Sequence, residues 1–197
     1  MVVVFGGAFN PPTIAHREIY YHIKKSLDFE TFIYLPVSNL YTKSSLISNY
    51  HRLSMLNHMV EDMEGTYVSE IELNDSDFLG TYKSLVRIQE QYNDEVAFVI
   101  GADNLRNIHN WKNAMSLLSE FKFIVINRDN IQIKDYIAND KILGQYIEHF
   151  YIIPKFNMNV SSTTFRETFD PYYVPEKVYE YIMLHGLYWG NLWITVF

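Results

Sequence analysis

The chain has 197 residues, of which 48% are hydrophobic and 20% charged, with a formal net charge of −7 and no cysteine. This composition is typical of one globular domain with a sizeable core. The absence of cysteine excludes disulfides, thiolate catalysis and cysteine-bound zinc, and it fits a cytoplasmic location. The negative charge argues against a nucleic-acid partner, and no apolar stretch is long enough to predict a membrane span.

The chain opens with an apolar run, residues 2–5, which predicts a buried strand that stops at Gly6 and Gly7. A helix is expected to begin soon afterwards, with Thr13 and His16 on one face of its first turn. Because glycine lacks a Cβ and a helix N-terminus is positively polarised, a phosphate could approach the backbone here. The sequence therefore predicts a site for a reacting phosphate, although His16 could instead be a solvated helix residue.

Strand-like and helix-like segments alternate along the rest of the chain. We expect strands at 2–5, 31–36, 66–71, 95–100, 121–126 and 149–153, and helices at about 14–27, 49–63, 81–92, 112–119 and 175–185. The apolar face of the second helix is expected to consist of Leu53, Leu56, Met59, Val60 and Met63. The alternation predicts right-handed βαβ crossovers and an α/β fold with a doubly wound parallel sheet.

Ligands bind such sheets at the carboxyl ends of the strands, and Gly101 and Asp103 follow the strand expected at 95–100. Gly101 allows a tight turn, and Asp103 could accept hydrogen bonds from ribose hydroxyls. Asp103 could instead cap the helix that follows. Its place at the end of a strand favours the binding role.

Four hydroxyl residues, 161–164, follow the last expected strand and enter a helix. Their side chains and the backbone amides could donate to phosphate oxygens. Arg166 lies one helical turn after Ser162 on the same face, and its planar guanidinium suits phosphate. Thr164 and Glu167 match a capping box, but capping explains one hydroxyl and not four with an arginine. Phosphate binding is therefore favoured.

Several of these segments resemble motifs of the nicotinate/nicotinamide mononucleotide adenylyltransferase family. Residues 13–16, Thr-Ile-Ala-His, resemble the (H/T)-x-G-H signature of nucleotidyltransferases, with Ala15 in place of the usual glycine. Residues 160–166, Val-Ser-Ser-Thr-Thr-Phe-Arg, resemble the family's I-S-S-T-x-x-R motif. Further blocks match in the family's order at residues 6–16, 36–43 with 50–55, 101–111 and 174–188.

The resemblance implies a single Rossmann-like nucleotidyltransferase domain over residues 1–188. It implies transfer of AMP from ATP to nicotinate or nicotinamide mononucleotide in NAD biosynthesis, with Mg²⁺ bridging the ATP phosphates and no dedicated protein ligands for the metal. The catalytic residues implied are His16, Thr13 and Arg166. The residues implied to bind ATP or phosphate are Gly7, Ala8, Phe9, Lys43, Gly101, Asp103, Ser161 and Ser162. The residues implied to bind the pyridine nucleotide are Asn10, Thr81 and Trp111.

The choice between the two pyridine acceptors stays open in the sequence. Lys83 stands where relatives often carry an acidic residue, and it could favour a nicotinate carboxylate or be an exposed helix lysine. Trp111 could stack on the pyridine ring or belong to the core. The two remaining alternatives for the function are adenylylation of another phosphorylated acceptor, such as phosphopantetheine or FMN, and a nucleotide-binding module without turnover.

Two segments have no role that the sequence defines. Arg128 follows the strand expected at 121–126 and could reach the cleft or make a surface ion pair. The C-terminal tail, residues 189–197, is more apolar than a free terminus should be. It could pack on the core, add an edge strand or support contacts in a homo-oligomer.

Overall fold

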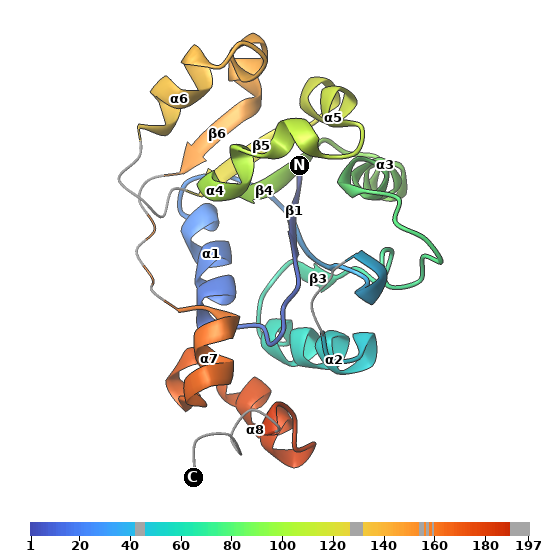
Figure 1. Ribbon diagram of the computed structural model, residues 1–197, viewed down its shortest axis with the longest axis vertical. Helices are drawn as coiled ribbons and strands as arrows, with labels where there is room; N and C mark the ends of the chain where they lie inside the picture. Colours follow the sequence, from blue (N-terminus) through green and yellow to red (C-terminus); the bar gives the residue numbers. More distant parts are fainter. Residues whose placement is uncertain (42–45, 127–131, 154–155, 157, 159, 190–197) are drawn as a thin grey trace.

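The computed structural model describes residues 1–41, 46–126, 132–153, 156, 158 and 160–189. A six-stranded sheet lies at its centre, with helices on both faces (Figure 1). None of the helices within these ranges has the length and apolar character needed to cross a membrane.

The strands are β1 (Val2–Gly7), β2 (Thr31–Pro36), β3 (Thr66–Val68), β4 (Val96–Gly101), β5 (Lys122–Ile126) and β6 (Phe150–Ile153). All neighbouring pairs are parallel, in the order β3-β2-β1-β4-β5-β6. Parallel pairing follows from the long connections between successive strands, because a parallel pair cannot be joined by a tight hairpin. The predicted α/β fold with a doubly wound parallel sheet is confirmed.

β3 is shorter than the strand expected at 66–71, because the chain leaves the sheet at Ser69. The Ser69 N–H still donates to the carbonyl oxygen of Tyr34 in β2, at 2.9 Å. The backbone then turns, and the Asn74 N–H donates to the carbonyl oxygen of Glu70 at 3.1 Å. Residues 69–80, called the 69–80 loop below, therefore run from the sheet edge to the next helix.

Five predicted helices are present: α1 (Ile14–Lys24), α2 (Asn49–Val60), α3 (Thr81–Tyr92), α5 (Ala114–Glu120) and α8 (Glu176–Leu184). A sixth, α7 (Ser162–Thr168), is the helix expected after the hydroxyl run. The helices expected from apolar periodicity did not include α4 (Ala102–Leu105) or α6 (Ile133–Asn139). Short 3-10 turns occupy Asn39–Tyr41, Ile108–Asn110, Leu143–His149 and Pro171–Tyr173.

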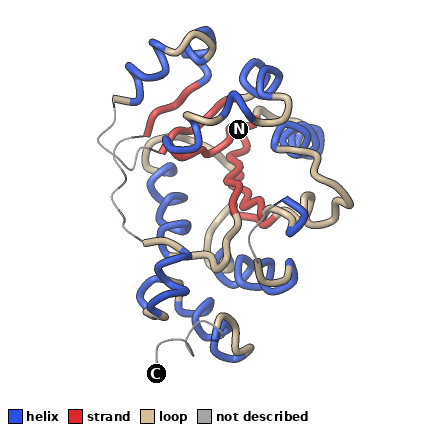
Figure 2. The backbone as a smooth tube through the Cα atoms, viewed as in Figure 1, coloured by secondary structure: helices blue, strands red, loops and turns tan. Residues whose placement is uncertain are grey.

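The sheet separates two apolar cores, and successive residues of β1 point into opposite ones. Val3 packs in the core that α1, α2, α7 and α8 cover. Val2 and Val4 pack in the core that α3, α4, α5 and α6 cover. Figure 1 shows the two groups of helices on different sides of the strands, and the tube in Figure 2 traces the same layers.

The strand order reverses direction at β1, which lies between β2 and β4. The chain passes from β1 to β2 on one side, and β4 and β5 extend the sheet on the other. Loops that leave β1 and β4 therefore diverge at their carboxyl ends and open a crevice between them. This is where the predicted site residues following Gly7 and Gly101 should meet.

Candidate active site

The loop between β1 and α1, residues 8–13, passes the carboxyl end of β1. Phe9 adopts a left-handed backbone conformation, with φ 46°, and its ring is buried. A Cβ at Gly7 would lie 3.0 Å from that ring, so a larger residue would have to displace it. The backbone of Gly7, Ala8 and Phe9 therefore turns tightly, as the phosphate-binding hypothesis requires. Their contact with a phosphate remains a prediction.

His16 is held in one orientation by the residue that begins its helix. The Thr13 backbone N–H donates to His16 Nδ1 at 2.9 Å, and the Thr13 hydroxyl lies 2.9 Å from the same nitrogen. Because Nδ1 accepts a hydrogen bond, the ring proton is assigned to Nε2. The imidazole also packs against Phe5 and Phe9, with ring centroids 5.9 and 5.0 Å away.

Thr13 is fully buried, and its hydroxyl faces His16. Thr13 and His16, predicted from their spacing to share one helix face, are thus in contact, and together they form a reciprocal cap at the start of α1. In this geometry Thr13 orients the imidazole, which in turn presents the Nε2–H as a hydrogen-bond donor. Because Thr13 is fully buried, its hydroxyl contacts His16 and is not exposed to solvent.

α7 docks on the loop that follows β1, although the two are far apart in the sequence. The Ser162 hydroxyl donates to the carbonyl oxygen of Pro11 at 2.7 Å, a contact between residues separated by 151 positions. Arg166 Nη1 donates to the carbonyl oxygen of Asn10 at 2.5 Å. These two bonds bring the predicted phosphate-binding side chains of α7 next to the loop that leads into His16.

Ser161 behaves differently from its neighbour Ser162. Its side chain accepts a hydrogen bond from the Thr164 N–H at 3.0 Å, so Ser161 is the N-cap of α7. The capping alternative is therefore confirmed for one hydroxyl of the run, at Ser161 and not at Thr164. Phosphate binding by Ser161 remains a prediction.

Asn10 is buried at the centre of this loop, with 5% of its surface exposed. Its side-chain oxygen lies 3.0 Å from the Tyr188 hydroxyl, which donates to it. The backbone N–H of Ile47 approaches the same oxygen at 3.4 Å. Asn10 thus links the loop to the C-terminal part of the chain, and its predicted contact with the pyridine nucleotide is untested.

Arg52 of α2 joins the loops after β1 and β2. At the sequence level it belonged only to the motif block at residues 50–55, with no role of its own. Its side chain is fully buried. Nη1 donates to the carbonyl oxygen of Ala8 at 2.8 Å, and Nη2 donates to the carbonyl oxygen of Val37 at 2.6 Å. The side-chain oxygens of Asn39 and Asn49 accept further bonds from Nη2 at 2.9 and 2.7 Å. Burial lowers the pKa of the guanidinium below its usual value.

Asp103 lies at the carboxyl end of β4, in the first turn of α4. The N-cap of this helix is Gly101, so the alternative that Asp103 caps it is wrong. A Cβ at Gly101 would lie against the Asp103 carboxylate, so the two residues are in close contact at the end of β4. The Asp103 side chain is exposed beside the crevice, where a ribose could reach it.

A cleft of about 250 Å³ opens beside the end of β1. The described residues that line it are Gly6, Gly7, Leu35, Val37, Glu72, Phe78, Thr81, Phe98 and Trp111. Trp111 packs edge-on against Phe98, with ring centroids 6.1 Å apart and planes at 78°. The structure thus brings Thr81 and Trp111, both predicted to bind the pyridine nucleotide, to one cleft with Gly7. Lys83 does not line it; the side chain is exposed, with Nζ 5.8 Å from the Tyr82 ring centre.

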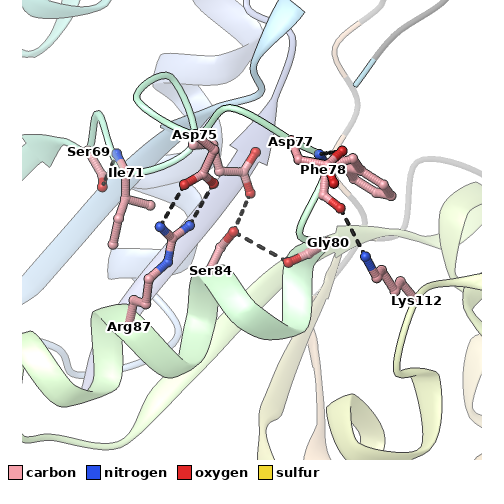
Figure 3. Close-up of polar contacts among 10 residues, drawn as sticks. Ser69, Ile71, Asp75, Asp77, Phe78, Gly80, Ser84, Arg87 and Lys112 are labelled. Carbon is pink, nitrogen blue, oxygen red and sulfur yellow. Dashed lines mark hydrogen bonds and ion pairs between the residues drawn. The ribbon is translucent and has the colours of Figure 1, made fainter. Parts of the chain in front are cut away.

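The 69–80 loop forms one wall of the cleft, and polar contacts attach it to the rest of the protein (Figure 3). Asp75 accepts two hydrogen bonds from the Arg87 guanidinium, each at 2.8 Å. Lys112 Nζ donates to the carbonyl oxygen of Phe78 at 3.0 Å. Because Lys112 follows Trp111 in the chain, this bond ties the loop to the opposite side of the cleft.

Glu72 is a buried carboxyl in that wall, with 3% of its surface exposed. Oε1 accepts a hydrogen bond from the Ser84 hydroxyl at 2.7 Å, whereas Oε2 is buried without a hydrogen-bond partner among the described residues. Burial raises the pKa of Glu72 from 4.5 to about 7, against the opposing effect of Ser84. No sequence pattern had pointed to Glu72 as a functional residue.

Replacing Glu72 with glutamine is expected to remove a pH-dependent loss of stability. Between pH 4.5 and about pH 7, the Glu72 carboxyl keeps its proton in the folded protein but loses it in the unfolded chain. The free energy of unfolding therefore falls as the pH rises through this range. A difference of this size corresponds to at most about 3 kcal/mol. Urea unfolding at about pH 5 and about pH 8 should show a fall in wild type that is about 2 kcal/mol larger than in Glu72→Gln.

Glu70→Gln is the matched control, because Glu70 is an exposed glutamate of the same loop. It should keep the pH dependence of the wild type. An equal pH dependence in wild type and Glu72→Gln would contradict the raised pKa.

Three predicted features lie outside the described residues. They are Lys43, Arg128 and residues 190–197 of the tail.

Comparison with known proteins identifies the family. The model of the cytidylyltransferase-like family matches residues 4–168. A protein of Acholeplasma laidlawii, named probable nicotinate-nucleotide adenylyltransferase, is 32% identical over 168 residues, which cover 85% of each chain. A protein of the same name from Listeria monocytogenes is 30% identical over 195 residues, with 95% and 96% covered. The chain belongs to the nicotinate-nucleotide adenylyltransferase family.

The fold agrees with this family assignment. The structure of the Plasmodium falciparum nicotinic acid mononucleotide adenylyltransferase complexed with NaAD superposes with a TM-score of 0.75, at 22% identity, covering 97% of this chain and 98% of that one. The resemblance stated from motifs at residues 13–16 and 160–166 is therefore confirmed at the level of the family. Both motifs lie within the matched residues 4–168.

Proposed function

We propose that the protein transfers AMP from ATP to the 5′-phosphate of nicotinate mononucleotide and releases pyrophosphate. The observation that carries the proposal is the docking of α7 on the 8–13 loop. The bonds from Ser162 to Pro11 and from Arg166 to Asn10 bring together the two motifs predicted to bind phosphate. The names of the relatives support nicotinate mononucleotide as the acceptor.

The reaction forms one P–O bond and breaks another at the α-phosphorus of ATP. The acceptor phosphate is already ionised near neutral pH, so an oxygen of this group attacks without a general base while pyrophosphate departs on the opposite side. The protein contributes positioning and charge stabilisation. His16 donates its Nε2–H to the transferring phosphate, and Thr13 keeps the imidazole in the required tautomer.

The leaving pyrophosphate is bound near the N-terminal part of α7. Ser161 supplies its hydroxyl and Ser162 its backbone N–H, because the single hydroxyl proton of Ser162 is donated to the carbonyl oxygen of Pro11. The guanidinium of Arg166 supplies several parallel donors. The backbone amides of residues 7–9 orient the phosphates from the other side. The carboxylate of Asp103 accepts hydrogen bonds from the adenosine ribose, and Gly101 lets it lie close to the chain.

Magnesium fits this site as an ion carried by the triphosphate. Within the described ranges, no group of three or more histidine, aspartate or glutamate side chains could enclose a metal ion. Mg²⁺ keeps several waters and is commonly held through substrate phosphates. When bound, the ion neutralises charge on the ATP phosphates. His16 and Arg166 then complete the positive surroundings of the reacting groups.

The acceptor ring occupies the cleft beside β1. Trp111 stacks on the pyridine ring, and Thr81 lies at the ring's substituent. The convergence of both residues on a cleft of about 250 Å³, close to the size of a small ligand pocket, supports these roles.

Replacing Trp111 with alanine should raise the KM for the mononucleotide by about tenfold, the loss expected of one aromatic stacking contact. The KM for ATP should change much less, because Trp111 lies in the cleft and not near α7, where the ATP phosphates are proposed to bind. Steady-state kinetics with each substrate varied in turn measures the difference. Equal increases in both constants would show that Trp111 serves only as a core residue.

Product analysis tests the proposed function. The purified protein is incubated with ATP, Mg²⁺ and one acceptor at a time: nicotinate mononucleotide, nicotinamide mononucleotide, phosphopantetheine or FMN. Mass spectrometry should detect the dinucleotide with nicotinate mononucleotide, in amounts equal to the pyrophosphate released. Product with phosphopantetheine or FMN alone would contradict the pyridine acceptor, and product with none would contradict adenylyl transfer.

A further inference from the structure

The cleft assigned to the pyridine ring has a single titratable side chain among the described residues that line it, the carboxyl of Glu72. The remaining lining residues are glycines, apolar or aromatic residues and Thr81. Only 3% of the surface of Glu72 is exposed, and its Oε2 has no hydrogen-bond partner among the described residues. A charge on this carboxyl would therefore act on the cleft with little screening by water.

The charged groups around Glu72 do not cancel such a charge. Asp75, on the same loop, raises the pKa of Glu72, and Arg87, from α3, lowers it. These two residues bind one another through two hydrogen bonds and so form a nearly neutral pair. Lys112 contacts the loop through the carbonyl oxygen of Phe78, and Lys83 lies over the Tyr82 ring. The segments of β1 and β2 that line the cleft contribute only uncharged residues.

We propose that Glu72 determines which pyridine mononucleotide the cleft accepts. In its neutral form the carboxyl admits an acceptor that bears a ring carboxylate. In its ionised form the carboxyl weakens binding of that acceptor, whereas binding of an acceptor with a ring carboxamide is almost unchanged. This inference rests on the proposed function, since it takes the cleft to be the site of the pyridine ring.

The physical basis is repulsion between like charges in a site shielded from water. A ring carboxylate on an acceptor held in this cleft of about 250 Å³ would face an ionised Glu72 in its wall, with little water between them to screen the repulsion. Repulsion at such a distance lowers kcat/KM for the charged acceptor by about tenfold or more. Nicotinamide mononucleotide carries the same 5′-phosphate without the ring carboxylate. The ratio of kcat/KM for the two acceptors therefore isolates the effect of Glu72 from the titration of the phosphate.

The experiment measures this ratio between about pH 5.5 and about pH 8.5 for the wild type, Glu72→Gln and Glu70→Gln. In the wild type and in Glu70→Gln the preference for nicotinate mononucleotide should fall by about tenfold or more as the pH rises, with a midpoint near 7. In Glu72→Gln the ratio should not depend on pH. A purely structural role for Glu72 would change both acceptors alike and leave the ratio unmoved.

Ser84→Ala provides a second variant that retains Glu72. Ser84 stabilises the ionised form by donating to Oε1, so its removal should move the midpoint of the ratio to higher pH. A wild-type ratio that is constant with pH, or an equal pH dependence in wild type and Glu72→Gln, would overturn the inference while leaving adenylyl transfer intact. A wild-type protein that forms no dinucleotide with either acceptor would overturn the proposed function and this inference with it.

Discussion

Replacement of His16 with alanine is expected to lower kcat by about 10²–10³, the usual cost of removing one donor to the charge that develops in a transition state. The Nδ1 atom accepts from the Thr13 N–H, so the variant loses the Nε2–H donor and a local helix cap together. The overall fold should persist, because His16 is only partly buried and a lost cap costs about 1 kcal/mol. Stopped-time assays of pyrophosphate release, with thermal unfolding as a check on the fold, measure both effects.

His22→Ala is the matched control for this prediction. His22 lies on the same helix, near its other end, and its ring packs against Phe156, 5.4 Å between centroids. Its removal should leave kcat within about twofold of the wild type, as expected for a residue away from the reacting atoms. A His16→Ala protein with near-normal turnover would remove His16 from the catalytic machinery.

Replacement of Arg52 with methionine is expected to destabilise the fold by about 3 kcal/mol or more. The change leaves the partly buried carbonyl oxygens of Ala8 and Val37 without the donors that the fully buried Arg52 supplies, and it also removes the bonds to Asn39 and Asn49. The same loss frees the 8–13 loop, so the KM for ATP should also rise. Urea unfolding gives the change in stability, and steady-state kinetics gives the change in KM.

Arg106→Met serves as the control, because Arg106 is exposed at the end of α4. It should change the free energy of unfolding by no more than about 0.5 kcal/mol. Arg52→Lys should resemble Arg52→Met in direction, since one ammonium group cannot reach the four acceptors that a guanidinium spans. A fully stable Arg52→Met protein would contradict the structural role assigned to these bonds.

Much of the fold follows from local patterns in the sequence. Apolar runs near 31–36 and 121–126 alternate with helical stretches, and this alternation alone predicts a parallel sheet. The strand at 66–71 was overestimated, because Ile71 continues the apolar pattern after the backbone has left the sheet. The helix α4 was missed because four residues are too few to show a helical period.

The residues predicted to bind phosphate could be named from the sequence, but their arrangement could not. Motif spacing indicated Ser162 and Arg166, yet their contacts with the carbonyl oxygens of Pro11 and Asn10 join segments about 150 residues apart. No local pattern reports such a contact. The same limit applies to Trp111, whose place in one cleft with Gly7 depends on the pairing of β4 with β1.

Arg52 and Glu72 show two different reasons for a missed residue. Arg52 occupies the apolar stripe of α2 with Leu56 and Met59, at spacings of four and seven residues, which is a detectable signal for a buried cation. The expected stripe began instead at Leu53, which is only partly buried. Glu72 carries no such signal, because an acidic residue in a polar loop is usually exposed.

The measurement that tests the account most directly is pyrophosphate release with ATP and Mg²⁺, compared between nicotinate mononucleotide, nicotinamide mononucleotide and no acceptor. We expect release that requires an acceptor, with the higher kcat/KM for nicotinate mononucleotide below pH 7. Acceptor-independent release, or none in a folded protein that binds ATP, would contradict it.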